Sequence, residues 1–287
     1  MNASTSKYRF LLIHAFSFPP GSQLSHRPFE GPKESRLPNY AQVRHVLDGI
    51  DWDVHPGPMA PYGDWAVENR AEFAQVAAAR LPIVREACES GKYNAIVLLG
   101  GGEPGFQEAR EIARPYGIPV SACGHSQMHI ATMLGNKFSV VDLAESHNMY
   151  YYNLVVQHRF DRHCASIRNV QIPFMRPGHP SEPSPQGERQ KAEHGERSEM
   201  VERAVSEAVC AIEEDGAEVI TFGCSAMFWL QPHVQRRLDE MGWEIPVLEG
   251  YTCSIALAKT LVDLGLSASG LTFPGDRPRK WRRKKTF

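Results

Sequence analysis

The chain lacks the cysteine pairs and long apolar runs that would assign it to several common classes of protein. Its six cysteines are scattered over 287 residues, and the absence of any CxxC pair argues against a zinc site or a thioredoxin-type motif. They are also too few for a disulfide scaffold, so we expect a cytoplasmic protein with free thiols. No apolar stretch approaches the roughly 20 residues of a membrane span, so we expect no membrane contact.

A strong charge of either sign is also missing. The formal net charge of -2 gives no global field that would select nucleic acid, and we expect no nucleic-acid partner. The apolar run at residues 9–13 is too short for a signal peptide and predicts a first buried strand. Apolar content of 42% and charged content of 22% are typical of a globular protein with a packed core.

Apolar runs that end in turn residues alternate with segments of helical periodicity, which favours an α/β fold with parallel sheets. The predicted strands are 93–99, 118–120, 137–141, 218–222 and 245–247, and the predicted helices are 106–116, 127–134, 198–215, 234–241 and 253–264.

The two halves of the chain share one layout. Residues 93–120 and 216–247 each contain an apolar strand, a glycine-containing turn, a helix and then Ile-Pro-Val. This repeat predicts two similar Rossmann-like lobes with one active site in the cleft between them. We expect residues 1–122 plus 248–272 in the first lobe and residues 123–247 in the second.

Two segments fall outside this pattern. Residues 177–196 are rich in Pro, Ser, Glu and Gln and are expected to form a flexible insertion, as a mobile flap or as a passive loop. Residues 273–287 form a basic tail, which would either bind an anionic surface or act as a targeting signal, or simply be a solubilising extension.

Cys224 is the first candidate for chemistry. It stands in a Gly-Cys-Ser turn between the predicted strand 218–222 and a following helix, where parallel sheets usually carry their sites. The helix dipole and free N–H groups are expected to lower the pKa of its thiol. Such a thiolate acts as acid, base or nucleophile without a cofactor; the alternative is a buried small apolar side chain.

Several segments together resemble the Asp/Glu/hydantoin racemase superfamily, and within it the hydantoin racemase branch. They are GGEPGFQEAREIARPYGIPV, QMHIATMLGNKFSVV, HCASIRNVQIPF, GAEVITFGCSAM and IPVLEG, spanning roughly residues 94–250. The resemblance implies a small-molecule substrate, no metal or organic cofactor, and a homo-oligomer. It also implies one cysteine from each lobe: one thiolate removes a proton from a carbon acid, and the other thiol returns one on the opposite face.

This chain departs from that pattern at the first cysteine. Cys224 matches the second-lobe cysteine, whereas Gly100 stands where the first is expected, directly before the turn 101–105. A two-thiol racemase is therefore not predicted. The arylmalonate decarboxylases resemble the one-cysteine pattern, but their hydroxyl-bearing turn is replaced here by Gly101 and Gly102. We expect the backbone N–H groups of residues 100–102 to hold an enolate or carboxylate.

Other positions of the expected binding set are also altered. The stretch from His14 to Ser17 replaces an Asn-Pro-Asn-type turn, and Asp142 replaces threonines after a strand. Asp142 is expected either to face a donor or cation on the substrate or to turn outward and cap a helix. Gly223 and Ser225 flank Cys224 and are predicted to contact the substrate. The cluster Tyr150 to Tyr152 would either line a pocket or belong to the core.

Three side chains are candidates to replace the missing thiol in proton transfer. Glu103 follows the glycines, His125 follows a predicted strand, and His14 ends the first one. Histidine titrates near neutral pH and suits either proton role, although a lone histidine is often structural. Cys123 is a further alternative, which would require its thiol to swing into the cleft.

The sequence thus predicts a cofactor-independent isomerase or racemase that acts on carbon next to a carbonyl. Its substrate would be small and polar, resembling an amino acid, a hydantoin or a cyclic amide, with Cys224 as the acid/base. Three alternatives remain: a single-cysteine decarboxylase, a thiol-dependent hydrolase, and a binding protein descended from an enzyme. Deuterium exchange, product handedness and a trapped acyl-thiol adduct would distinguish them.

Overall fold

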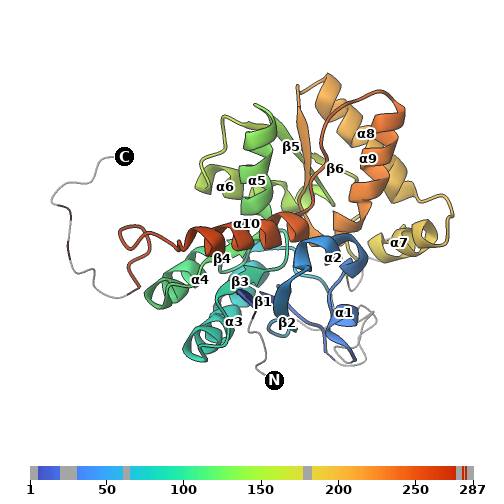
Figure 1. Ribbon diagram of the computed structural model, residues 1–287. Coiled ribbons are helices and arrows are strands. Elements are labelled where there is room, and N and C mark those ends of the chain that lie inside the picture. Colours follow the sequence, from blue (N-terminus) through green and yellow to red (C-terminus); the bar gives the residue numbers. More distant parts are fainter. Residues whose placement is uncertain are drawn as a thin grey trace.

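A computed structural model describes residues 6–19, 31–60, 65–176, 183–275, 280 and 282. It contains two separate parallel sheets with helices packed around each, as Figure 1 shows. The strand order is β2-β1-β3-β4 in one sheet and β6-β5-β7 in the other. The prediction of an α/β fold with two parallel-sheet lobes is confirmed.

The first sheet forms from strands whose apolar residues are buried by helices. It contains β1 (Tyr8–Ile13), β2 (Ile50–His55), β3 (Ala95–Leu98) and β4 (Val120–Ala122). Every residue of β3 and β4 is buried, which explains why they read as continuous apolar runs. The helices of this part are α1 (Lys33–Arg36), α2 (Tyr40–Leu47), α3 (Arg70–Glu89), α4 (Phe106–Ala113), η1 (Arg114–Tyr116) and α10 (Gly250–Leu264).

The second sheet is smaller and has the same parallel arrangement. It contains β5 (Phe138–Asp142), β6 (Cys164–Asn169) and β7 (Val219–Phe222). The predicted strand 245–247 is reduced to a single bridge between Val247 and Ile220. The helices of this part are α5 (Cys123–Leu134), η2 (Glu145–His147), α6 (Asn148–Gln157), α7 (Pro185–Glu193), α8 (Glu199–Glu213), η3 (Ser225–Leu230) and α9 (Gln231–Glu240).

Helix α10 joins the two parts of the molecule. It lies across the boundary between the sheets in Figure 1 and packs against α2, β3 and β4 of the first part and α5 of the second. The end of the chain therefore returns to the first sheet, as the predicted lobe boundaries require. The exact boundaries remain a prediction.

Part of the predicted flexible insertion is an ordered helix. Helix α7 begins after Ser184, whose side chain accepts a hydrogen bond from the Gly187 N–H. The buried carboxylate of Glu188 accepts bonds from the Ser198 hydroxyl and the Met200 N–H, which fix α7 to α8. The insertion prediction is wrong for this helix because these partners are distant in sequence. Residues 177–182 and most of the basic tail lie outside the described residues.

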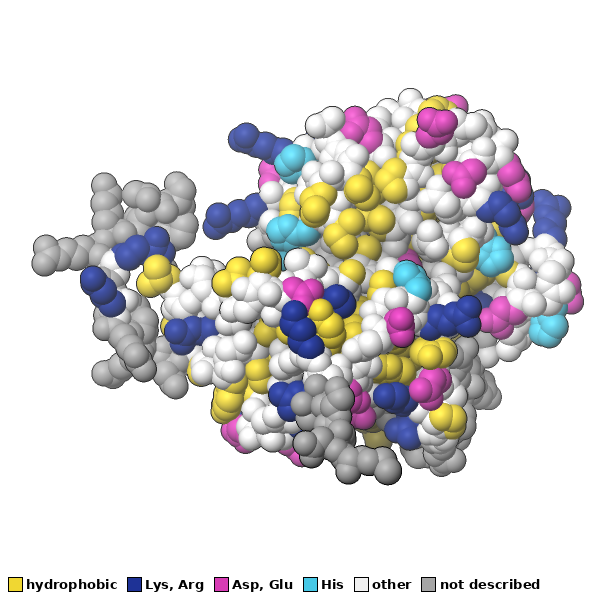
Figure 2. Space-filling view, viewed as in Figure 1, with side chains coloured by type: hydrophobic (Ala, Val, Ile, Leu, Met, Phe, Trp, Pro, Cys, Tyr) yellow, Lys and Arg dark blue, Asp and Glu magenta, His cyan; other side chains and the backbone are white. Residues whose placement is uncertain are grey.

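The described surface carries exposed apolar side chains on α5 and α6. Within the described residues, no helix is both long and apolar enough to cross a bilayer. Figure 2 shows apolar side chains gathered over the upper part of the molecule. The large exposed ones on α5 and α6 include Met133, Leu134, Tyr152 and Val156. Homo-oligomerisation and a cytoplasmic location remain predictions.

A buried arginine fixes the ends of the two central strands of the first sheet. Arg80 projects from α3 and donates to the carbonyl oxygens of Ile13, Leu99 at 2.8 Å and Pro104 at 3.3 Å. Burial lowers the pKa of Arg80 to about 9, so the guanidinium is still charged at neutral pH. The Arg80 side chain therefore fixes the position of the loop that follows β3.

Arg80→Leu should destabilise the fold, because the carbonyl oxygens of Leu99 and Pro104 lose the guanidinium donor and that of Ile13 keeps only the Leu99 N–H. We expect the free energy of unfolding to fall by about 2–4 kcal/mol in urea titrations. Arg85→Leu is the matched control, since Arg85 lies on the same helix and is exposed. Equal stability of the two variants would contradict the role assigned to Arg80.

Candidate active site

The two predicted glycine turns meet at the boundary between the sheets. We call residues 100–102 the glycine loop and residues 223–225 the cysteine turn. A Cβ atom on Gly101 would overlap the carbonyl oxygen of Gly223, so the two backbones are in direct contact. Gly100 has φ +110°, and a Cβ there would lie 2.7 Å from Ala15 Cβ. The backbone at Gly100, where the first cysteine of the family is expected, thus favours glycine.

The cysteine turn follows β7, as predicted, and is held by a buried carboxylate. The Cys224 N–H donates to Asp142 Oδ1 at 2.8 Å, and the Ala226 N–H points at the thiol. Burial raises the pKa of Cys224, the Asp142 charge raises it further, and the Ala226 hydrogen bond opposes both. The expected lowering of this pKa is wrong, because burial disfavours the thiolate, a carboxylate lies under the turn, and the turn continues only into a short 3-10 helix.

Asp142 supports the cysteine turn from inside the protein. Its side chain is fully buried, and Oδ2 lies 3.3 Å from His147 Nδ1. Burial alone would lower the pKa of His147, but the hydrogen bond and charge of Asp142 outweigh it and raise this pKa. The carboxylate therefore neither caps a helix nor turns outward. Oδ1 accepts the Cys224 N–H and Oδ2 faces the His147 ring, and the predicted contact of Asp142 with the substrate remains a prediction.

The glycine loop presents unpaired backbone N–H groups. Within the described residues, the amides of Gly101 and Gly102 donate no hydrogen bond, whereas the Gly100 N–H points at the Cys123 thiol. The carbonyl of Gly102 accepts from the Tyr150 hydroxyl at 2.7 Å, which fixes the loop against α6. The loop thus has the donors expected for holding an enolate or carboxylate, and this role remains a prediction.

The structure brings Glu103 and His125 together, but as partners of each other. The buried Glu103 carboxylate accepts the His125 N–H and lies 2.8 Å from His158 Nε2. Burial and three cationic or titratable neighbours lower the pKa of His125 to about 2, so its ring is neutral. His125 Nε2 also lies 3.0 Å from His129 Nε2. These contacts brace the loop after β3, and a proton-transfer role for either residue remains a prediction.

The remaining predicted residues lie at the carboxyl ends of the first-sheet strands and beside the cysteine. His14 Nε2 is 3.1 Å from the Arg36 carbonyl oxygen, and burial lowers the pKa of His14 to about 4. The Ser17 N–H donates to Pro58 at 2.8 Å. Ser225 hydrogen-bonds Tyr251. The Cys123 thiol is buried and donates to the Leu98 carbonyl at 3.5 Å, so it does not enter a cleft.

Two charged residues near the site were missed by the sequence analysis. Arg176, which follows β6, binds Glu72 at 2.6 Å and Glu68 at 2.8 Å, and so connects the second part of the molecule to the start of α3. The Glu68 charge adds to the raised pKa of Cys224. Isolated charges of this kind carry no periodic signal, so only the tertiary structure reveals them.

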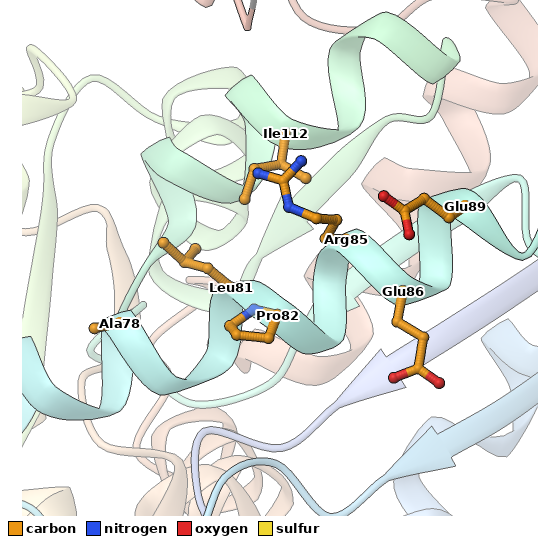
Figure 3. Close-up of a pocket in the computed structure, with 7 residues that line it drawn as sticks. All are labelled: Ala78, Leu81, Pro82, Arg85, Glu86, Glu89 and Ile112. Carbon is orange, nitrogen blue, oxygen red and sulfur yellow. The ribbon is translucent and has the colours of Figure 1, made fainter.

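Two described cavities border the site region, and the larger one, of about 340 Å³, has Glu103 and Tyr150 in its lining. A cavity of about 280 Å³ is lined by Glu68, Asn69, Arg70, Ser146, Tyr150 and Arg176. A groove of about 510 Å³ along α3, shown in Figure 3, contains none of the predicted site residues. In the part of the chain that the structure describes, no group of three His, Cys, Asp or Glu is arranged to hold a metal.

Comparison with known proteins identifies the family of this chain. Residues 58–258 match the profile of the family described as Asp/Glu/Hydantoin racemase, which includes the glycine loop and the cysteine turn. The chain belongs to this racemase family. The predicted membership of an enzyme family of racemases is therefore confirmed.

Several known proteins are similar to this chain in sequence or in fold. The hydantoin racemase of Rhizobium meliloti is 26% identical over 204 residues, covering 71% of this chain and 74% of that protein. The allantoin racemase of Pseudomonas fluorescens superposes with TM-score 0.69 at 23% identity, covering 96% and 99% of the chains. A mutant of arylmalonate decarboxylase superposes with TM-score 0.54 at 11% identity over 89% and 92%. These structures show the shared fold.

Asp142→Asn should increase the reactivity of Cys224. Removing the carboxylate charge lowers the pKa of the thiol, while the amide oxygen can still accept the Cys224 N–H. Alkylation at about pH 8 should then speed up about tenfold for each unit by which the pKa falls. Peptide mass spectrometry would follow Cys224 separately from the other five cysteines. Unchanged alkylation, relative to an Asp161→Asn control on the surface, would contradict this coupling.

His125 should make the protein sensitive to acid. Its pKa of about 2 in the folded state lies below its ordinary value, so the unfolded chain binds an extra proton below about pH 6.5. Stability is therefore lost as the pH falls, by up to about 1.4 kcal/mol per pH unit. His125→Gln should flatten this slope in urea titrations, whereas the exposed His194→Gln should not. Parallel slopes in all three proteins would refute the assignment.

Proposed function

We propose that this protein is a cofactor-independent isomerase that moves a proton at a carbon next to a carbonyl group. The observation that carries the proposal is the meeting of the cysteine turn and the glycine loop, within a chain of the racemase family. The cysteine turn supplies the thiol of Cys224. The glycine loop supplies free N–H groups beside it, where the negative charge of an enolate would develop.

Burial and the nearby charges support a protonated Cys224 thiol in the resting protein. Burial and the carboxylates of Asp142 and Glu68 keep the Cys224 thiol protonated, so the resting group is a proton donor. As an acid it gives its proton to the enolate carbon, and the small thiolate fraction acts as base in the opposite direction. Bound enolate is stabilised mainly by the glycine loop, because the buried surroundings of Cys224 are negative.

We infer a cyclic amide as the substrate, with a hydantoin or a related ureide as the first compound to test. The relatives named hydantoin racemase and allantoin racemase support this class. In such rings the exchanging carbon is next to a carbonyl, so the anion is delocalised onto an oxygen that N–H donors can bind. His14 and Ser17, at the end of β1, are proposed to contact the ring.

A second candidate function is a single-cysteine decarboxylase. Gly100 at the first cysteine position and a thiol held in its protonated form both favour it, because loss of carbon dioxide creates the carbanion without a base. The product would then be a single enantiomer. Either function leaves Cys224 as the group that protonates carbon.

Proton NMR in D₂O tests the proposal directly. Wild type should introduce deuterium next to the carbonyl of 5-substituted hydantoins, and Cys224→Ala should reduce this rate at least about 1,000-fold because the acid/base is gone. Cys224→Ser keeps the size of the side chain and should be almost as slow. The same spectra with arylmalonates would reveal decarboxylation. Equal exchange by wild type and Cys224→Ala would contradict the role of the thiol.

A further inference from the structure

The hydroxyl of Tyr151 makes no hydrogen bond within the described residues, although the residue as a whole is buried at the candidate site. Tyr151 lies on α6 and is 3% exposed, with its ring in an apolar cluster that includes Leu154 and Val155. Among the described residues its hydroxyl makes no hydrogen bond, whereas that of neighbouring Tyr150 donates to Gly102. The oxygen itself is not fully enclosed, so a bound molecule can reach it.

The position of this hydroxyl connects it to both halves of the site. A Cβ on Gly101 would lie 2.6 Å from the Tyr151 oxygen, so the hydroxyl reaches the glycine loop one residue after the position of the missing thiol. The charges of Asp142 and Cys224 act on Tyr151 from the other side. Burial and these charges raise the pKa of Tyr151, which keeps its proton in place at neutral pH.

The other candidates for the missing group are already engaged. Glu103 is bonded to His125 and His158, and the His14 ring contacts the Arg36 carbonyl. Using one of these for proton transfer would first require an existing contact to break. The Tyr151 hydroxyl needs no such rearrangement to reach a bound molecule.

We propose that the Tyr151 hydroxyl replaces the first-lobe thiol as the second proton-transfer group; this rests on the isomerase function proposed above. The Cys224 thiolate takes the proton from one face of the substrate carbon, and the C–H electron pair becomes the enolate. The Tyr151 hydroxyl then gives its proton to the opposite face. The products are the inverted substrate, a thiol and a tyrosinate, so protons and charge balance. The opposite enantiomer reacts by the reverse path, with the tyrosinate as base.

Tyr151→Phe separates this role from the others, because it removes only the oxygen. With a substrate that wild type racemises in D₂O, inversion should fall at least about 100-fold. Deuterium should still enter one enantiomer with retained configuration, since the partly exposed Cys224 can take and return a proton on its own face. Chiral chromatography and proton NMR measure the two rates. Tyr152→Phe, on the exposed side of the same helix, should behave as wild type.

The possible failures are distinguishable. If folded Tyr151→Phe loses exchange and inversion equally, the hydroxyl is a hydrogen-bond donor to the enolate and the inference is overturned. Unchanged inversion also overturns it. Wild type that exchanges deuterium without inversion overturns this inference but leaves the role of Cys224 intact. An absence of exchange by wild type across the hydantoin panel overturns the isomerase function and this inference together.

Discussion

The backbone contact between Gly101 and Gly223 is the constraint on which the site depends. Each glycine lies in a turn that follows a parallel strand, Gly101 after β3 and Gly223 after β7, and a side chain at Gly101 would force the two turns apart. Because the contact is between main chains, no side chain separates the two segments. The N–H groups of the glycine loop therefore lie close to the cysteine turn. Arg80 below one turn and Asp142 below the other hold this contact from both sides.

The same two supports set the electrostatics of the site. A guanidinium lies beneath the glycine loop and a carboxylate lies beneath the cysteine turn, so the loop is suited to an anion and the thiol retains its proton. The buried charges therefore give the two positions different roles: Cys224 is kept ready to donate a proton, and the glycine loop is suited to hold negative charge. The Asp142–His147 pair lets the carboxylate remain buried beside Cys224 at moderate cost.

Much of the fold could be predicted because its central strands are apolar throughout and end in glycine turns. Strand β2 and edge strand β6 escaped notice, since IDWDVH and CASIRN mix polar and apolar residues. Helix α3 was missed as well, because Pro82 lies in its interior, where proline normally ends a helix. For the site, local sequence placed Cys224 and the glycine loop correctly at strand ends. It could not show that the thiol would be buried or which charge would lie under it, and burial together with that charge reverses the expected direction of its pKa shift.

The backbone at Gly100, where the family resemblance predicts the first cysteine, favours glycine. Gly100 has a positive φ that a cysteine would adopt only under strain, and Ala15 fills the space for its Cβ. A thiol therefore cannot return there by a simple substitution. Any chemistry that needs a second proton must draw it from another element, and α6 is the described element that brings an unpaired, protonated hydroxyl to this loop. The glycine loop and Tyr151 thus form one arrangement, in which the absence of a side chain on the loop leaves room for the Tyr151 hydroxyl.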